Sequence, residues 1–150
     1  MEVFRICREI YSDRITASGI ANRWNLRGQF VVYAGASRSL TTLELVVHRN
    51  SIISGTAYKV MVISISDDES KVSQIPLNEL PANWRTMEAI AALQQIGAKW
   101  YNDQKNLLLK VPSVIIPYEY NYVINTEHSD FKKDVVLARI EDYYWDNRLM

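Results

Sequence analysis

Hydrophobic residues along the chain follow two different spacings. Several short runs are rich in β-branched and aromatic side chains and alternate with polar positions, which is typical of half-buried strands. These predicted strands lie at residues 3–6, 29–34, 58–66, 107–111, 113–116 and 135–140. Most of them follow one another without a crossover helix. The pattern therefore favours an α+β fold with mixed or antiparallel sheets over a doubly wound parallel sheet.

Two longer stretches have the spacing of helices. The first runs to about His48, and Ser37 or Ser39 is suited to cap its first turn. The second is predicted over residues 83–97, with Gly97 at its end, because glycine often follows the last helical residue.

The first predicted helix carries a carboxylate on its apolar face. Leu40, Leu43, Glu44 and Val47 follow the i, i+3, i+4, i+7 spacing that places side chains on one face of a helix. An unpaired charge on a buried face costs several kcal/mol or changes its pKa. Glu44 is therefore expected to have either a buried partner or a ligand.

Composition narrows the class of protein. The chain has 150 residues, 48% of them hydrophobic and 23% charged, so we expect one globular domain over residues 1–150. The 17 Lys and Arg residues balance 17 Asp and Glu residues, which argues against nucleic acid binding through phosphate contacts. Cys7 has no second cysteine to pair with, and no apolar run approaches the ~20 residues that span a bilayer. We expect a cytoplasmic protein without membrane contact.

The sequence lacks the motifs of several enzyme classes. It has no glycine-rich phosphate loop, no H-E-x-x-H and no G-x-S-x-G, and His48 and His128 lack metal-ligand spacing. An active site would therefore use arginine, tyrosine, glutamate, serine and asparagine. Two stretches concentrate such candidates, which are Arg23, Trp24, Asn25, Tyr33 and Glu44 in one and Ser113, Asn121 and Asn125 in the other.

Each candidate also has a structural explanation. Arg23 and Trp24 fit a cation–π pair on a turn. Tyr33 fits the edge of a core, and Ser113 fits a strand end. Glu44 fits a salt bridge to Arg38 or Arg49. Spacing leaves these alternatives open, and only the place of Glu44 on an apolar face demands a partner or a ligand.

An ordered set of short motifs runs through the chain. It begins with R-W-N at residues 23–25 and continues with G-x-x-V-V-Y-A, S-x-x-L-T-T-L-E-L-V-V-H, L-P-x-x-W, G-x-x-W, V-P-S and N-Y-x-x-N-x-x-H. In this order, over residues 3–149, the set resembles the RES domain, a family named for its arginine, glutamate and serine. Turn residues differ from the family pattern: Ala21 and Asn22 replace a pair of glycines, and Thr126 and Ser129 stand where prolines are common.

The resemblance implies a fold similar to that of ADP-ribosyltransferases, with a compact two-sheet core, an NAD⁺-sized cleft between the sheets and helices outside. It implies a toxin that degrades NAD⁺ by breaking the nicotinamide–ribose bond. Cleavage would be hydrolysis, or phosphorolysis with phosphate as co-substrate, and would need no metal or other cofactor. The alternative is an ADP-ribosyltransferase that modifies a protein or small-molecule acceptor. A second alternative is a non-catalytic interaction module.

The resemblance also implies which residues form the site. The catalytic residues would be Arg23, Tyr33, Glu44 and Ser113, and the substrate-binding residues would be Arg23, Trp24, Asn25, Tyr33, Asn121 and Asn125. Glu44 would stabilise the positive charge that develops on the ribose. Arg23 would bind the pyrophosphate or the ribose edge, and Tyr33 would stack on nicotinamide. The Ser113 hydroxyl would bind the ribose or orient Arg23.

A partner follows from the same resemblance. RES toxins pair with Xre-type antitoxins, so we expect a hetero-oligomer in which a helix-turn-helix antitoxin covers the cleft. The antitoxin would carry the DNA binding, which fits the neutral charge of this chain.

Overall fold

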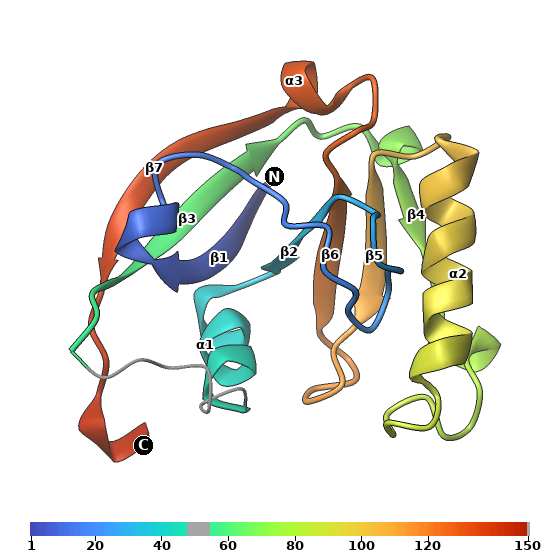
Figure 1. Cartoon of the computed structure of the whole chain (residues 1–150), viewed down its shortest axis with the longest axis horizontal. Helices are drawn as coiled ribbons and strands as arrows, with labels where there is room; N and C mark the ends of the chain where they lie inside the picture. The colour runs from blue at the N-terminus through green and yellow to red at the C-terminus, as the bar shows by residue number, and fades with distance from the viewer. Residues whose placement is uncertain (48–54, 150) are drawn as a thin grey trace.

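The computed structural model describes residues 1–47 and 55–149, so the predicted helix end at His48 lies outside the described residues. Within this part of the chain, seven strands form one sheet in the order β4-β5-β6-β2-β1-β3-β7 (Figure 1). The strands are β1 (Glu2–Arg8), β2 (Val31–Gly35), β3 (Tyr58–Ile65), β4 (Val72–Gln74), β5 (Leu108–Pro112), β6 (Tyr120–Asn125) and β7 (Val135–Tyr143). The helices are α1 (Arg38–Val47), α2 (Ile90–Asp103) and the short α3 (Phe131–Asp134).

The sheet has two parts that meet at one point. β1 pairs with β3 over its whole length but with β2 only at Phe4 and Gly35. From this junction the strands β1, β3 and β7 run in one direction, and β2, β6, β5 and β4 in another (Figure 1). All neighbours are antiparallel except β4 and β5. The α+β prediction is confirmed, and the two expected sheets are two parts of one sheet.

Two large clusters of buried side chains hold the two parts of the sheet and α2 together. The first lies between the two parts of the sheet and joins Val3, Met61 and Ile63 to Val32, Leu108 and Ile124. The second packs α2 on the other face of β2, β5 and β6 through residues that include Trp24, Trp84, Leu93, Trp100, Leu109 and Val123. Consecutive residues Leu108 and Leu109 enter different clusters, which explains why β5 reads as a continuous apolar run.

α1 begins as its sequence predicts. Ser37 Oγ accepts a hydrogen bond from Leu40 N at 3.1 Å, so Ser37 caps the helix. Thr41 Oγ1 donates to Phe4 O at 3.1 Å and ties α1 to β1. Within the described ranges, no helix combines the length and the apolar character needed to cross a bilayer.

α2 differs from the prediction at both ends. Residues 83–89 form turns, and Gly97 lies inside the helix rather than after it. A Cβ on Gly97 would lie 1.7 Å from Trp24 O, so this glycine permits a close approach of two backbones. The helix instead ends at Asp103, and the next residue, Gln104, caps it with a φ of 51° in the left-handed region.

The strand predicted at residues 113–116 is also wrong. These residues form a turn between β5 and β6, in which Ser113 N donates to Glu119 O at 2.9 Å. The strand in this region is β6, whose aromatic and polar residues did not satisfy the strand pattern. The short β4 was missed for a different reason, since it has only 3 residues.

Candidate active site

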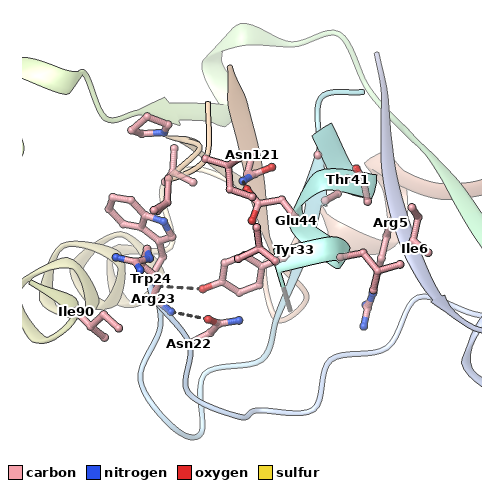
Figure 2. Close-up of a pocket in the computed structure, with 18 of the residues that line it drawn as sticks. Arg5, Ile6, Asn22, Arg23, Trp24, Tyr33, Thr41, Glu44, Ile90 and Asn121 are labelled. Carbon is pink, nitrogen blue, oxygen red and sulfur yellow. Dashed lines mark hydrogen bonds between the residues drawn. The ribbon is translucent and has the colours of Figure 1, made fainter. Parts of the chain in front are cut away.

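A cavity of about 580 Å³ lies at the junction of the two parts of the sheet. β1 from one part and β2, β5 and β6 from the other contribute to its wall, together with α1, residues 22–24 and 114–115, Met87 and Ile90. Its volume is in the range of small-molecule and cofactor sites. In the view of Figure 2, Arg23 lies at one side of the cavity, Arg5 at the other, and Glu44 between them. The expected cleft is therefore present, at the junction within one sheet.

The Glu44 carboxylate is held at the cavity wall by the β5–β6 hairpin. Its Oε1 accepts hydrogen bonds from Ser113 Oγ at 2.9 Å and from Asn121 Nδ2 at 2.7 Å. Of the two arginines proposed as its partners, Arg38 forms a bidentate ion pair with Glu141 at 2.6 and 2.8 Å, and Arg49 lies outside the described residues. Two neutral donors on a hairpin thus orient a carboxylate on a helix, which answers the need for a partner.

Ser113 is fully buried and acts through its neighbours. Besides donating to Glu44, its Oγ accepts hydrogen bonds from Ile115 N at 3.1 Å and Ile116 N at 3.2 Å. The hydroxyl therefore fixes the turn and orients Glu44. The contact with the ribose or Arg23 that the family resemblance implies stays a prediction. Asn121, by contrast, lines the cavity directly.

Arg23 reaches the cavity from the loop before β2. Its Nη1 donates to Trp84 O at 3.1 Å and Thr86 O at 3.3 Å. Burial lowers the pKa of Arg23, and the nearby Glu44 acts in the opposite direction. Because a guanidinium has five N–H donors, these two carbonyls leave capacity for an anionic ligand.

The Tyr33 hydroxyl is used inside the protein. It donates to Asn25 Oδ1 at 2.8 Å and accepts from Trp24 N at 3.1 Å. Burial raises the pKa of the phenol, so Tyr33 stays neutral at physiological pH. The aromatic ring, rather than the hydroxyl, is what Tyr33 offers to a ligand in the cavity.

The two asparagines Asn25 and Asn125 lie outside the cavity lining. Asn25 Nδ2 donates to Ile20 O at 3.0 Å and Leu26 O at 3.1 Å, so this buried amide holds the loop that supports Tyr33. Asn125 is four residues from Asn121 along β6, about 13 Å at the usual strand rise. Its Oδ1 accepts from Glu127 N at 3.0 Å. Both side chains stabilise turns in this structure.

Trp24 has two roles in the structure. Its side chain is only 3% exposed and belongs to the cluster that packs α2 against the sheet. Part of the residue also lines the cavity beside Arg23 (Figure 2).

Arg5 is a charged cavity residue that the sequence did not single out. It lies in β1 and donates from Nη1 to Thr16 O at 3.1 Å, and burial lowers its pKa. A signal was present, because Arg5 stands between the apolar residues Phe4 and Ile6 in a short strand. A charge inside an apolar run was the signal that identified Glu44.

Comparison with known proteins agrees with the motifs. Residues 2–146 match the RES domain family. The chain is 30% identical to "Toxin Res" of Yersinia enterocolitica, over 89% of this chain and 86% of the relative. It is 31% identical to the "Prs ADP-ribosylating toxin" of a Sphingobium species, over 95% and 91%, and 29% identical to "Toxin Res" of Photorhabdus laumondii, over 100% and 97%. The chain therefore belongs to the RES domain family.

Proposed function

We propose that this chain is a toxin that binds NAD⁺ in the cavity and cleaves the bond between nicotinamide and ribose. Membership of the RES family and the names of the toxin relatives support the biological role. The observation that carries the chemistry is the Glu44 carboxylate, oriented by Ser113 and Asn121 at the wall of a cavity that also contains Arg23.

The bond to nicotinamide breaks with its electron pair going to the ring nitrogen, which neutralises the cationic pyridinium. Positive charge then develops on the ribose, and a fixed carboxylate stabilises it without having to reorganise. Glu44 has this role in our proposal. Ser113 and Asn121 keep its carboxylate in place through the two hydrogen bonds to Oε1.

Charge at the two sides of the cavity suits a dinucleotide. NAD⁺ has a pyrophosphate with two negative charges, and planar guanidinium groups bind phosphate oxygens well. Arg23 and Arg5 both line the cavity, and each has a backbone carbonyl as a neutral partner. Tyr33 adds an aromatic ring to the wall, suited to stacking on nicotinamide.

The acceptor of the ribosyl group decides the reaction class. Water gives ADP-ribose and a proton, and inorganic phosphate gives the 1-phosphate of ADP-ribose. Transfer to a protein or small molecule is the second candidate, favoured by the Sphingobium relative, whose name describes ADP-ribosylation of Prs. All three share the first bond cleavage.

The test is incubation of the purified chain with NAD⁺, with and without phosphate and with cell extract. Mass spectrometry of the products and detection of ADP-ribosylated protein distinguish the acceptors, with Glu44→Gln as the inactive control. Release of nicotinamide by the wild-type chain is expected. Unchanged NAD⁺ under all conditions would leave a non-catalytic interaction module as the explanation.

A further inference from the structure

One short segment next to the cavity is held from two sides. Trp84 O and Thr86 O accept hydrogen bonds from Arg23 Nη1, at 3.1 and 3.3 Å. Between these two residues, Arg85 Nε donates to Val114 O at 2.9 Å. The next residue, Met87, lines the cavity. The segment 84–87 therefore contacts Arg23 on one side and the turn after β5 on the other.

Arg85 binds the same turn that orients Glu44. Ser113 Oγ accepts from the amides of Ile115 and Ile116 and donates to Glu44 Oε1. The carbonyl of Val114 lies within this turn of residues 113–116. Through Arg85, the turn that fixes Glu44 thus also anchors the segment whose carbonyls hold Arg23.

We propose that Arg85 is a positioning residue: it fixes the segment 84–87 to the 113–116 turn, and the segment then holds the Arg23 guanidinium in the cavity. This proposal rests on NAD⁺ as the ligand of the cavity. Arg85 itself is exposed and is not among the residues that line the cavity. Its effect on the ligand is therefore indirect and passes through Arg23.

The bond between Arg85 and Val114 contributes more to geometry than to stability. It is exposed, so water replaces the donor when Arg85 is removed, and the loss of folding stability is small. Water cannot, however, hold the carbonyls of Trp84 and Thr86 at the positions where they bind Arg23. Loosening the segment should therefore weaken ligand binding while the melting temperature stays nearly constant.

Binding of NAD⁺ can be measured by calorimetry in a Glu44→Gln background, where turnover does not consume the ligand. In this background Arg85→Ala is expected to raise Kd about 3- to 10-fold, the range that one lost hydrogen bond produces. Arg85→Lys keeps a charged donor and should restore part of the affinity. The control is Arg27→Ala, which removes an exposed arginine away from the cavity and should leave Kd unchanged.

A double-mutant cycle tests whether Arg85 acts through Arg23. Once Arg23 is replaced by alanine, Arg85→Ala should cause no further change in Kd, because residues that act through one contact are not additive. Additive effects of the two substitutions would overturn the proposal, as would an unchanged Kd in Arg85→Ala alone.

Hydrogen exchange gives a readout that needs no ligand. In Arg85→Ala, the amides of residues 84–87, 115 and 116 should exchange faster than in wild type, whereas Arg27→Ala should not alter them. Unchanged exchange would overturn the proposal. A third outcome is that Arg85→Ala exchanges faster but the protein without this substitution does not bind NAD⁺. This result would support the positioning role of Arg85 and refute the proposed function.

Discussion

Two neutral donors share one oxygen of Glu44: the Ser113 hydroxyl at 2.9 Å and the Asn121 amide at 2.7 Å. Both belong to the β5–β6 hairpin, while Glu44 belongs to α1. A glutamine at position 44 can offer its own side-chain oxygen to the same donors. Charge and geometry at this position can therefore be separated experimentally.

Glu44→Gln is expected to reduce NAD⁺ cleavage at least about 100-fold, because it removes the charge that stabilises the ribosyl cation. The protein should remain folded, since the hydrogen bonds and the side-chain volume are retained. Rates of nicotinamide release and thermal unfolding of both proteins check this. Activity within a few-fold of wild type would reduce Glu44 to a structural role.

Tyr33 permits a prediction about stability. Tyr33→Phe removes the hydroxyl that bridges Asn25 Oδ1 and Trp24 N, and leaves both groups without that partner. A lost partner of a buried polar group costs about 1–3 kcal/mol, so the free energy of unfolding should fall by that amount. Denaturant unfolding measures it. Tyr118→Phe is the matched control, because Tyr118 is 86% exposed and should have no effect.

Tyr33 also affects how stability depends on pH. Burial raises its pKa above the value of about 10 that tyrosine has in an unfolded chain. Above pH ~10 the unfolded chain releases this proton and the folded chain keeps it, so the free energy of unfolding falls as the pH rises. Unfolding measured from pH 8 to 11 should show a shallower fall in Tyr33→Phe. Equal slopes in both proteins would contradict the buried, neutral phenol.

At the scale of whole elements, α2 makes one close backbone contact in addition to its side-chain packing. Gly97 lies in the middle of the helix, and the carbonyl of Trp24 occupies the place of its missing side chain. The contact places the helix against the loop that carries Arg23. It therefore links the packing of α2 to the geometry of the cavity.

Gly97→Ala tests this contact, because intrinsic helix propensity and packing predict opposite signs. Alanine would stabilise an unhindered helix by about 1 kcal/mol. Here its Cβ would lie 1.7 Å from Trp24 O, so we expect a net loss of about 1–3 kcal/mol or more. NAD⁺ cleavage should fall as well, since Arg23 lies beside Trp24. Gln95→Ala, at an exposed position of the same helix, should be neutral, and a stabilised Gly97→Ala would refute the close approach.

Some elements are predicted well from the sequence and others are not. The difference depends on whether the interactions that fix an element are local or join residues that are distant in sequence. α1 was predicted well because its Ser37 cap and its apolar spacing are local. The end of α2 was predicted wrongly because Gly97 is required by the close approach of Trp24, which is distant in sequence, and not by the end of the helix. β6 was missed because polar residues such as Asn121, which lines the cavity, interrupt the alternation of apolar and polar positions that predicts a strand.

In the candidate site, too, the sequence identified single residues but not the contacts between distant parts of the chain. Glu44 was singled out by the apolar face around it. Arg23 and Ser113 were candidates by residue type, and the resemblance to the RES family implied their catalytic roles. That Ser113 and Asn121 both hold Glu44 follows from the pairing of β5 with β6 and of β2 with β6, which no local pattern encodes. Arg5 enters the cavity for the same reason, through the single pairing of β1 with β2.

At the scale of the whole molecule, two exposed apolar side chains line the cavity. Val47 and Met87 both line the cavity and are 63% and 74% exposed. Exposed apolar side chains around a binding site are typical of surfaces that a partner covers. We propose that the cognate antitoxin, of the Xre type that the family resemblance implies, covers these two side chains and blocks access to Glu44.

An enzyme that consumes NAD⁺, as we propose for this chain, must be held inactive by a partner in the cell that makes it. Expression of this chain alone should therefore stop growth and lower cellular NAD⁺. Co-expression with the cognate antitoxin should restore both, through a stable hetero-oligomer that size-exclusion chromatography detects. Expression of Glu44→Gln alone should leave growth and NAD⁺ normal, because the variant keeps the fold and lacks the charge that cleavage needs. Equal toxicity of Glu44→Gln and wild type would separate growth arrest from NAD⁺ cleavage. Normal growth and normal NAD⁺ at high levels of the intact wild-type chain would refute the toxin function itself.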